Sequence, residues 1–178
     1  MNKNIKILSV QGICLALAII TSTYIKIFHM PLGGSVSLCS MLFVALPSYF
    51  FGVKIGLISS FAFSILTFVI DPLFYYPMQF IFDYILAFTS LGLTGIFREK
   101  KYGLQIGFSI AVFFRFLFTS ISGYLFFREY VPIGWNPIFY TVIYNGSYMS
   151  IELLFTLIII GIPPIQKILI TMKQKFNQ

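Results

Sequence analysis

Charged residues are scarce in this chain. Only 10% of its 178 residues are Asp, Glu, Lys or Arg, whereas soluble domains have about 25%. The low charge, combined with a hydrophobic content of 58%, excludes an ordinary soluble domain and predicts an integral membrane protein. At about 20 residues per helical span, the chain can form about six spans with short connections. We therefore expect a single membrane domain, residues 1–178, with no separate soluble domain.

The chain also has few side chains suited to catalysis. Its one histidine, His29, lies in a predicted loop, which argues against a Ser-His hydrolase. Cys14 and Cys39 lack the spacing of metal ligands, and the sequence has no nucleotide-binding loop. We therefore expect no enzymatic activity, no metal and no other cofactor in this chain.

Basic residues exceed acidic ones and give a net charge of +7. They are spread over short loops and chain ends and form no patch with interleaved aromatic rings, so nucleic acid is not an expected partner. With a cytoplasmic N-terminus, nine of them would lie inside and only Lys26 and Arg128 in outer loops. By the positive-inside rule, we predict a multi-pass protein of the cell membrane with both termini in the cytoplasm.

Hydrophobic runs and helix breakers divide the chain into six expected transmembrane helices, so the predicted fold class is an all-α bundle in the lipid bilayer. The pair Asp71-Pro72 ends the third helix, because a residue before proline is pushed out of helical geometry. Three outer loops are rich in Pro, Gly and aromatic residues and form the expected binding face. The expected helices cover about residues 5–28, 38–51, 53–70, 78–97, 104–127 and 138–169.

Ionisable side chains interrupt the fourth and fifth expected helices. Gln79 and Asp83 share one face of the fourth, and Arg115 and Thr119 share one face of the fifth, because residues four apart lie one turn apart. A charged group in lipid is costly and is by default a candidate for a functional site. The simplest alternative is a structural ion pair between Asp83 and Arg115. Arg115 could otherwise contact a ligand or reach water through a cavity.

The segment YTVIYNGSYMSIE, near the start of the last expected helix, carries the densest polar cluster. Tyr140, Tyr144, Tyr148 and Glu152 recur every four residues, with Asn145 beside them. An aromatic belt also places tyrosines near a membrane interface, but a belt does not continue down one face for three turns. We interpret the cluster as part of a pocket at the outer ends of the last three helices. Its rings, amide and carboxylate suit a flat cationic or nitrogen-rich molecule.

Small residues form a strip on the first expected helix. Gly12, Ala16 and the nearby Ala18 would let another helix approach closely. Such a strip serves either a partner protein or packing within the chain, and the spacing leaves both possibilities open.

Four motifs resemble, in order and spacing, those of one family of vitamin transporters. The segments MPLGGSVSL, YYPMQFIFDYILAF, RFLFTSISGYLFF and YTVIYNGSYM are similar to motifs of the thiamine-specific substrate-binding (S) components of energy-coupling factor (ECF) importers. The resemblance implies a six-helix membrane protein that captures thiamine from outside with high affinity. It also implies partner subunits, namely a transmembrane coupling protein and two ATPases that use ATP. The S component would tumble in the membrane to release its cargo inside.

The resemblance also implies roles for individual residues. Asp83 is expected to hydrogen-bond the aminopyrimidine, Phe127 to stack on a ligand ring, and Tyr140 and Asn145 to fix the orientation of the ligand. The full implied substrate-binding set is Asp83, Tyr84, Thr119, Gly123, Phe127, Tyr140 and Asn145.

Two further contacts follow from the same resemblance. The loop around Gly33, Gly34 and Ser35 would act as a lid, and Gly12 and Ala16 would meet the coupling protein.

The chain departs from some family members at two pocket positions. Thr119 stands where they have histidine, and Phe127 stands where they have tryptophan. Each change would weaken binding by about 1 kcal/mol or more, or would accompany a related ligand. The alternatives are therefore another small vitamin or a thiamine precursor such as hydroxymethylpyrimidine. A membrane scaffold without a ligand is an alternative of another class, although it does not explain the polar outer pocket.

Overall fold

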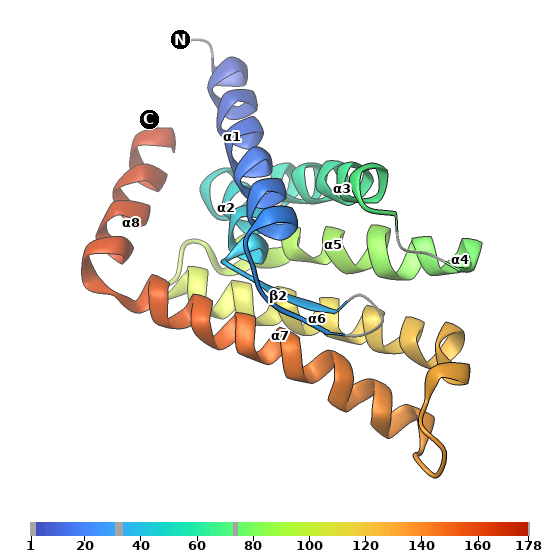
Figure 1. Ribbon diagram of the computed structural model, residues 1–178. Helices are drawn as coiled ribbons and strands as arrows, with labels where there is room; N and C mark the ends of the chain where they lie inside the picture. Colours follow the sequence, from blue (N-terminus) through green and yellow to red (C-terminus); the bar gives the residue numbers. More distant parts are fainter. Residues whose placement is uncertain (1–2, 31–33, 73–74, 178) are drawn as a thin grey trace.

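The protein is a helical bundle with one small two-stranded sheet, as seen in a computed structural model that describes residues 3–30, 34–72 and 75–177 (Figure 1). The segment η2 is a π-helix, and η3 and η4 are 3₁₀-helices. The elements are α1 (Lys3–Tyr24), β1 (Lys26–His29), β2 (Ser35–Ser37), α2 (Ser40–Phe51), α3 (Val53–Ile70), α4 (Pro77–Gln79), η2 (Phe80–Leu86), α5 (Ala87–Thr89), η3 (Ser90–Phe97), α6 (Gly103–Phe126), η4 (Arg128–Tyr130), α7 (Pro137–Gly161) and α8 (Pro163–Asn177).

Five helical stretches among the described residues are long and apolar enough to cross a membrane. They are α1, α3, the continuous stretch from α4 to η3, α6 and α7. Helix α2 has only 12 residues, and at 1.5 Å per residue it would reach about 18 Å, less than the hydrocarbon core of about 30 Å. The all-α membrane bundle is thus confirmed, whereas a sixth span remains a prediction.

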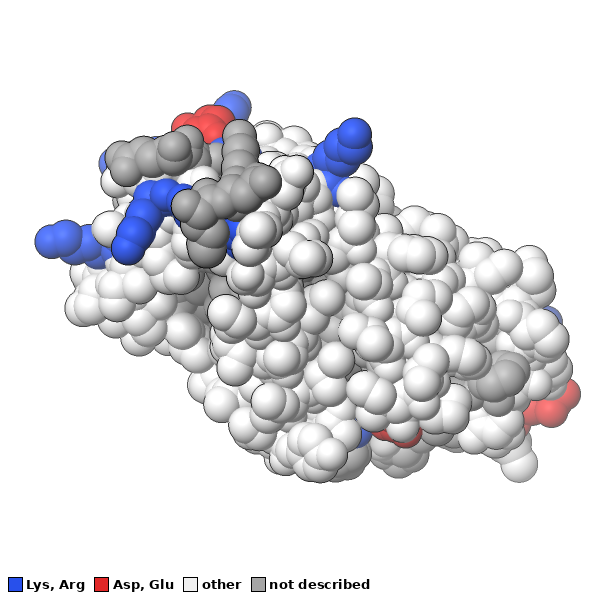
Figure 2. All heavy atoms as spheres, turned by 90° about the horizontal axis from the view of Figure 1, so that it is seen from above, with Lys and Arg blue, Asp and Glu red and all other residues white. Residues whose placement is uncertain are grey.

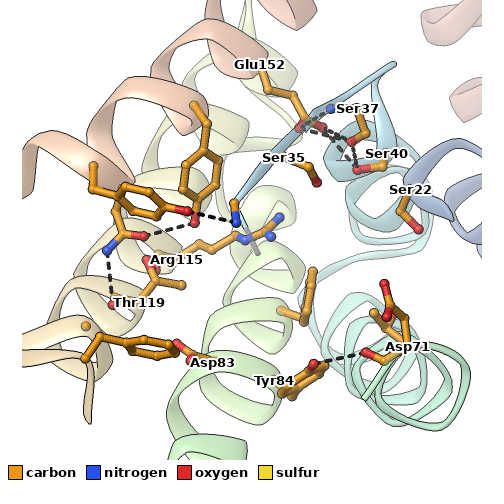
Figure 3. Close-up of a pocket in the computed structure, with 18 of the residues that line it drawn as sticks. Ser22, Ser35, Ser37, Ser40, Asp71, Asp83, Tyr84, Arg115, Thr119 and Glu152 are labelled. Atoms are coloured by element: carbon orange, nitrogen blue, oxygen red, sulfur yellow. Dashed lines mark hydrogen bonds between the residues drawn. The ribbon is translucent and has the colours of Figure 1, made fainter. Parts of the chain in front are cut away.

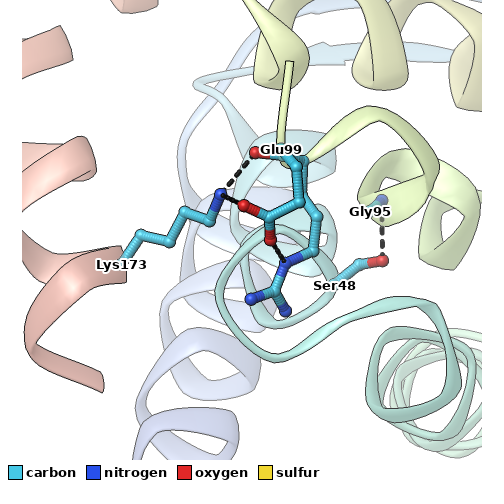
Figure 4. Close-up of polar contacts among 5 residues, drawn as sticks. Ser48, Gly95, Glu99 and Lys173 are labelled. Carbon is cyan, nitrogen blue, oxygen red and sulfur yellow. Dashed lines mark hydrogen bonds and ion pairs between the residues drawn. The ribbon is translucent and has the colours of Figure 1, made fainter. Parts of the chain in front are cut away.

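Helix α2 forms the centre of the core. It packs against α1, α3, η3 and α8, and Val44 and Ala45 have no exposed surface. The Ser48 hydroxyl donates to the carbonyl of Gly92. It also accepts a 2.9 Å hydrogen bond from the N–H of Gly95 (Figure 4). Because lipid cannot satisfy these groups, the serine joins α2 to η3 through bonds made inside the bundle.

The last expected helix is broken in two, so the prediction of one helix over residues 138–169 is wrong. Helix α7 ends at Gly161, Ile162 is extended, and α8 begins at Pro163. Proline lacks a backbone N–H and disfavours helical geometry in the residue before it. The chain therefore turns at this point, and α8 points away from α7 (Figure 1).

The first expected helix is shorter than predicted. Helix α1 ends at Tyr24, and β1 follows and pairs antiparallel with β2. On α1, Gly12 and Ala16 are exposed, and a Cβ added at Gly12 would meet no atom within 4 Å. Ala18 is fully buried in the core, so it belongs to internal packing and not to the exposed part of the strip.

The two ends of the chain lie on the same side of the bundle. Nζ of Lys6 donates to the carbonyl of Lys175 at 2.6 Å, and the ring of Phe176 packs 5.2 Å from that of Phe50. In the view from above, most Lys and Arg side chains gather toward one end, and most of the other visible surface is uncharged (Figure 2). The assignment of this side to the cytoplasm remains a prediction.

Candidate substrate-binding site

A cavity of about 360 Å³ lies among α3, η2, α6, α7 and the β1–β2 hairpin. Pockets for small molecules usually measure about 300–1,000 Å³. Gly34 and Ser35 of the expected lid loop line it, and Gly33 falls outside the described residues. The cavity is also lined by every member of the predicted binding set: Asp83, Tyr84, Thr119, Gly123, Phe127, Tyr140 and Asn145.

Asp83 and Tyr84 are presented by the π-helix η2. Such turns, with i→i+5 hydrogen bonds, are rare and often occur at functional sites. The Tyr84 hydroxyl donates to the carbonyl of Asp71 at 3.1 Å, and its ring packs edge-on against Phe68 with centroids 5.2 Å apart. These contacts hold η2 against the end of α3, with the Asp83 carboxylate at the cavity (Figure 3).

Arg115 extends from α6 into the cavity (Figure 3). Its guanidinium lies 4.3 Å from the centroid of the Phe88 ring, which is a cation–π arrangement. Among the described residues, Nε has no hydrogen-bond partner, and no carboxylate oxygen lies within 4.0 Å of the guanidinium. The alternative of an ion pair between Arg115 and Asp83 is therefore wrong for this structure, in which the guanidinium packs on the ring of Phe88.

The polar face of α7 lines the cavity over three turns, as the four-residue spacing predicts. The rings of Tyr140 and Tyr144 stack with centroids 6.1 Å apart. Asn145 is buried, its Nδ2 donates to the carbonyl of Thr119 at 3.3 Å, and its Oδ1 accepts from the Tyr148 hydroxyl at 3.0 Å. These two bonds fix which end of the amide is the donor and which is the acceptor.

Gly123 and Phe127 shape the cavity near the end of α6. A Cβ added at Gly123 would lie 2.5 Å from Cγ2 of Thr141, so glycine permits the close approach of α6 and α7. Phe127 follows the last residue of α6, and its ring lies edge-on to that of Tyr75 at 5.9 Å and 6.0 Å from that of Tyr130. Of these three rings, Phe127 lines the cavity, and Tyr75 and Tyr130 pack beside it.

Comparison with known proteins identifies the family of this chain. The family model described as "Thiamine transporter protein (Thia_YuaJ)" matches residues 8–172. The chain belongs to this thiamine transporter family. It is 34% identical over 134 residues to Thiamine transporter ThiT of Bacillus subtilis (strain 168), covering 67% of this chain and 69% of the relative. It is 28% identical over 99 residues to Thiamine transporter ThiT of Lacticaseibacillus paracasei, covering 48% of this chain and 49% of the relative.

The fold of this thiamine transporter family member matches a solved structure. The structure of ThiT from Listeria monocytogenes superimposes with a TM-score of 0.82 over 98% of this chain and 99% of that one, at 22% identity. At this identity the likeness shows the fold alone, which is the helical membrane bundle. The relatives are named as transporters, which is a non-enzymatic role.

Charged groups in the cavity of this family member are unequal in number. Its lining includes the carboxylates of Asp71, Asp83 and Glu152 and the cations of Lys26 and Arg115. Nζ of Lys26 lies 3.7 Å from Oδ2 of Asp71. With their usual charges, these groups leave one negative charge in excess. The cavity is therefore complementary to a ligand with one positive charge.

Three side chains of α7 have larger roles than the sequence indicated. The binding set implied by the resemblance leaves out Tyr144, Tyr148 and Glu152, yet all three line the cavity. Tyr144 and Glu152 also bond residues of the hairpin, at separations of 110 and 115 residues along the chain. The four-residue spacing identified their helix face, whereas no local pattern identifies partners so distant in sequence.

Proposed function

We propose that this chain is the thiamine-binding S component of an energy-coupling factor importer and captures the vitamin from outside the cell. Thiamine transport is the activity for which its family is named. The observation that carries the proposal is the gathering of the motif residues around one cavity with an excess of negative charge. Thiamine has a flat aminopyrimidine and a thiazolium ring with one positive charge, and both features suit this cavity.

The ligand contacts follow from the chemistry of each side chain. Asp83 accepts hydrogen bonds from the aminopyrimidine, since an ionised carboxylate offers only acceptors. Phe127 stacks on a ligand ring, and Tyr140 provides a further aromatic face for the cation. Asn145 fixes the orientation of the ligand, with Tyr84, Thr119 and Gly123 completing the wall.

Coupling to energy would occur through α1. Gly12 and Ala16 lie on an exposed face of this helix, and a Cβ added at Gly12 would meet no atom within 4 Å. Small residues permit close contact between helices in lipid. We propose that this face meets a transmembrane coupling protein, which in turn binds two ATPases. In this arrangement the chain lies in the cell membrane with both termini in the cytoplasm and needs no cofactor of its own.

Titration of the purified protein tests the proposal. Calorimetry would be run with thiamine, its phosphates and hydroxymethylpyrimidine, alongside the fluorescence of Trp135, the sole tryptophan. The Trp135 ring lies 6.2 Å from that of Tyr140, so a ligand at Tyr140 should change its emission. We expect saturable binding that is tightest for thiamine. The absence of saturable heat with every probe would refute the proposal and favour a ligand-free scaffold.

A precursor of thiamine is the second candidate ligand, because Thr119 and Phe127 are smaller than the histidine and tryptophan found in some family members. Both residues line the cavity, so these two differences from some family members lie in the proposed binding site. If hydroxymethylpyrimidine binds more tightly than thiamine in the same titration, the precursor is the natural ligand.

A further inference from the structure

Glu152 is a buried carboxylate with a full set of protein partners. Its side chain is only 3% exposed. It accepts hydrogen bonds from the N–H groups of Ser37 and Met41, both at 3.2 Å, and from the hydroxyls of Ser37 and Ser40 at 3.1 Å (Figure 3). An ionised carboxylate acts only as an acceptor, so this set of donors suits it.

The partners of Glu152 belong to two different elements. Ser37 ends β2, whereas Ser40 and Met41 lie in the first turn of α2. The first N–H groups of a helix lack partners within the helix, and a negative charge beside them is favourable. One side chain of α7 therefore fastens both the return strand of the hairpin and the start of the central buried helix.

A second contact joins the same face of α7 to the hairpin. The N–H of Gly34 donates to the Tyr144 hydroxyl at 3.1 Å. A Cβ added at Gly34 would lie 2.8 Å from this hydroxyl and 3.0 Å from the Tyr148 ring, so glycine is needed for the close approach. Tyr144 and Glu152 are eight residues apart, about two helical turns. The hairpin is thus held at two separated points along its return strand.

We propose that Glu152 and Tyr144 are positioning residues that hold the hairpin against α7 and thereby set how long a ligand stays in the cavity. Gly34, Ser35 and Ser37 all line the cavity, so detachment of this strand would open its wall. Glu152 acts through the hairpin and α2, since its oxygens already accept bonds from both. The part of this inference that concerns ligand residence rests on the function proposed above.

The test compares Glu152→Gln and Tyr144→Phe with the wild-type protein. Glutamine keeps the shape of the side chain but turns an NH₂ group toward donors, and phenylalanine keeps the ring but removes the hydroxyl that accepts from Gly34. Glu129→Gln is the matched control, because Glu129 is an exposed carboxylate in η4 that does not line the cavity. Dissociation and association rates of thiamine would be followed by stopped-flow fluorescence of Trp135.

We expect Glu152→Gln to raise the dissociation rate about tenfold or more, as loss of a charged, buried hydrogen-bond set implies. Tyr144→Phe should have a smaller effect in the same direction, with the association rate of both variants changed by less than about threefold. A variant that is merely destabilised would have a smaller folded fraction, but its folded molecules would bind and release thiamine at wild-type rates. Wild-type dissociation from Glu152→Gln would therefore overturn the proposal.

Hydrogen exchange of the ligand-free protein separates this proposal from the thiamine assignment. Glu152→Gln should speed exchange at the amides of Ser37 and Met41, and Tyr144→Phe at that of Gly34, while Glu129→Gln leaves them unchanged. If the variants exchange faster but the protein binds no thiamine, the result supports the two contacts and refutes the proposed function. Unchanged exchange in both variants would refute the contacts, whichever ligand binds.

Discussion

The Tyr148 hydroxyl donates a 3.0 Å hydrogen bond to Oδ1 of Asn145, while Nδ2 of the same amide donates to the carbonyl of Thr119 at 3.3 Å. The amide is therefore held from α6 and from its own helix. An asparagine side chain has two donor hydrogens and two acceptor lone pairs, so one of each remains for a ligand. The two hydrogen bonds therefore fix the directions of the remaining Nδ2 donor and Oδ1 acceptor of Asn145 before a ligand binds.

Tyr148→Phe should weaken thiamine binding about threefold to tenfold, because loss of a neutral hydrogen bond costs about 0.5–1.5 kcal/mol. The affinity would be measured by calorimetry. Tyr124→Phe is the matched control, since Tyr124 is exposed on α6 and does not line the cavity. An unchanged affinity in Tyr148→Phe would mean that Asn145 needs no such support.

Asp83→Asn should weaken thiamine binding about a hundredfold, because it removes a charged acceptor from the cavity while nearly keeping its volume. Calorimetry would measure the affinity, and the thermal unfolding midpoint in detergent should stay close to that of the wild type. Asn145→Ala should have a still larger effect and abolish binding in a folded protein. Binding by Asp83→Asn within about threefold of wild type would show that this acid does not meet the ligand.

Ala16→Trp should leave thiamine affinity unchanged and stop uptake. Ala16 lies on the exposed face of α1, where a large ring would hold another helix away. Uptake would be measured in vesicles that contain the coupling protein and both ATPases. Ile158→Trp, on an exposed position of α7, serves as the control. Normal uptake by Ala16→Trp would exclude this face as the contact with the coupling protein.

Glu99 should make stability depend on pH at the end of the bundle where the chain termini meet. Its carboxylate lies 2.9 Å from Nζ of Lys173 and 2.7 Å from Nε of Arg98 (Figure 4). Hydrogen bonds from Lys173 and Arg98 lower the pKa of Glu99 below its usual value. A lowered pKa stabilises the fold above the unfolded value of about 4.3, and this stabilisation is lost as pH falls through the lower folded value.

The matching measurement is thermal unfolding of Glu99→Gln and wild type across this pH range. The variant should unfold at a lower temperature near neutral pH, and the difference should vanish in acid below the folded pKa. Because the Glu99 side chain is 74% exposed, its contribution should be at most about 1 kcal/mol. Glu129→Gln is the control. A difference that persists in strong acid would assign the effect to packing and not to charge.

The sequence predicted the bundle and the set of residues around the cavity with short-range signals. Hydropathy located the spans, and spacing by four placed Tyr140, Tyr144 and Tyr148 on one face of α7, because helix geometry is a local property. The motifs around Asp83 and Gly123 identified further residues that line the cavity. The break at Pro163 was also a local signal, and it was missed because apolar residues such as Ile165, Ile168 and Leu169 recur beyond it.

Only the tertiary structure decided which distant groups meet. Glu152 could have faced a ligand, lipid or protein, and its partners Ser37 and Ser40 lie more than a hundred residues away. Arg115 could have paired with Asp83, yet it lies over Phe88. A sequence by itself determines which faces of its helices are polar, because that follows from periodicity. Which polar group satisfies another depends on how the helices pack, and packing is set by contacts across the whole chain.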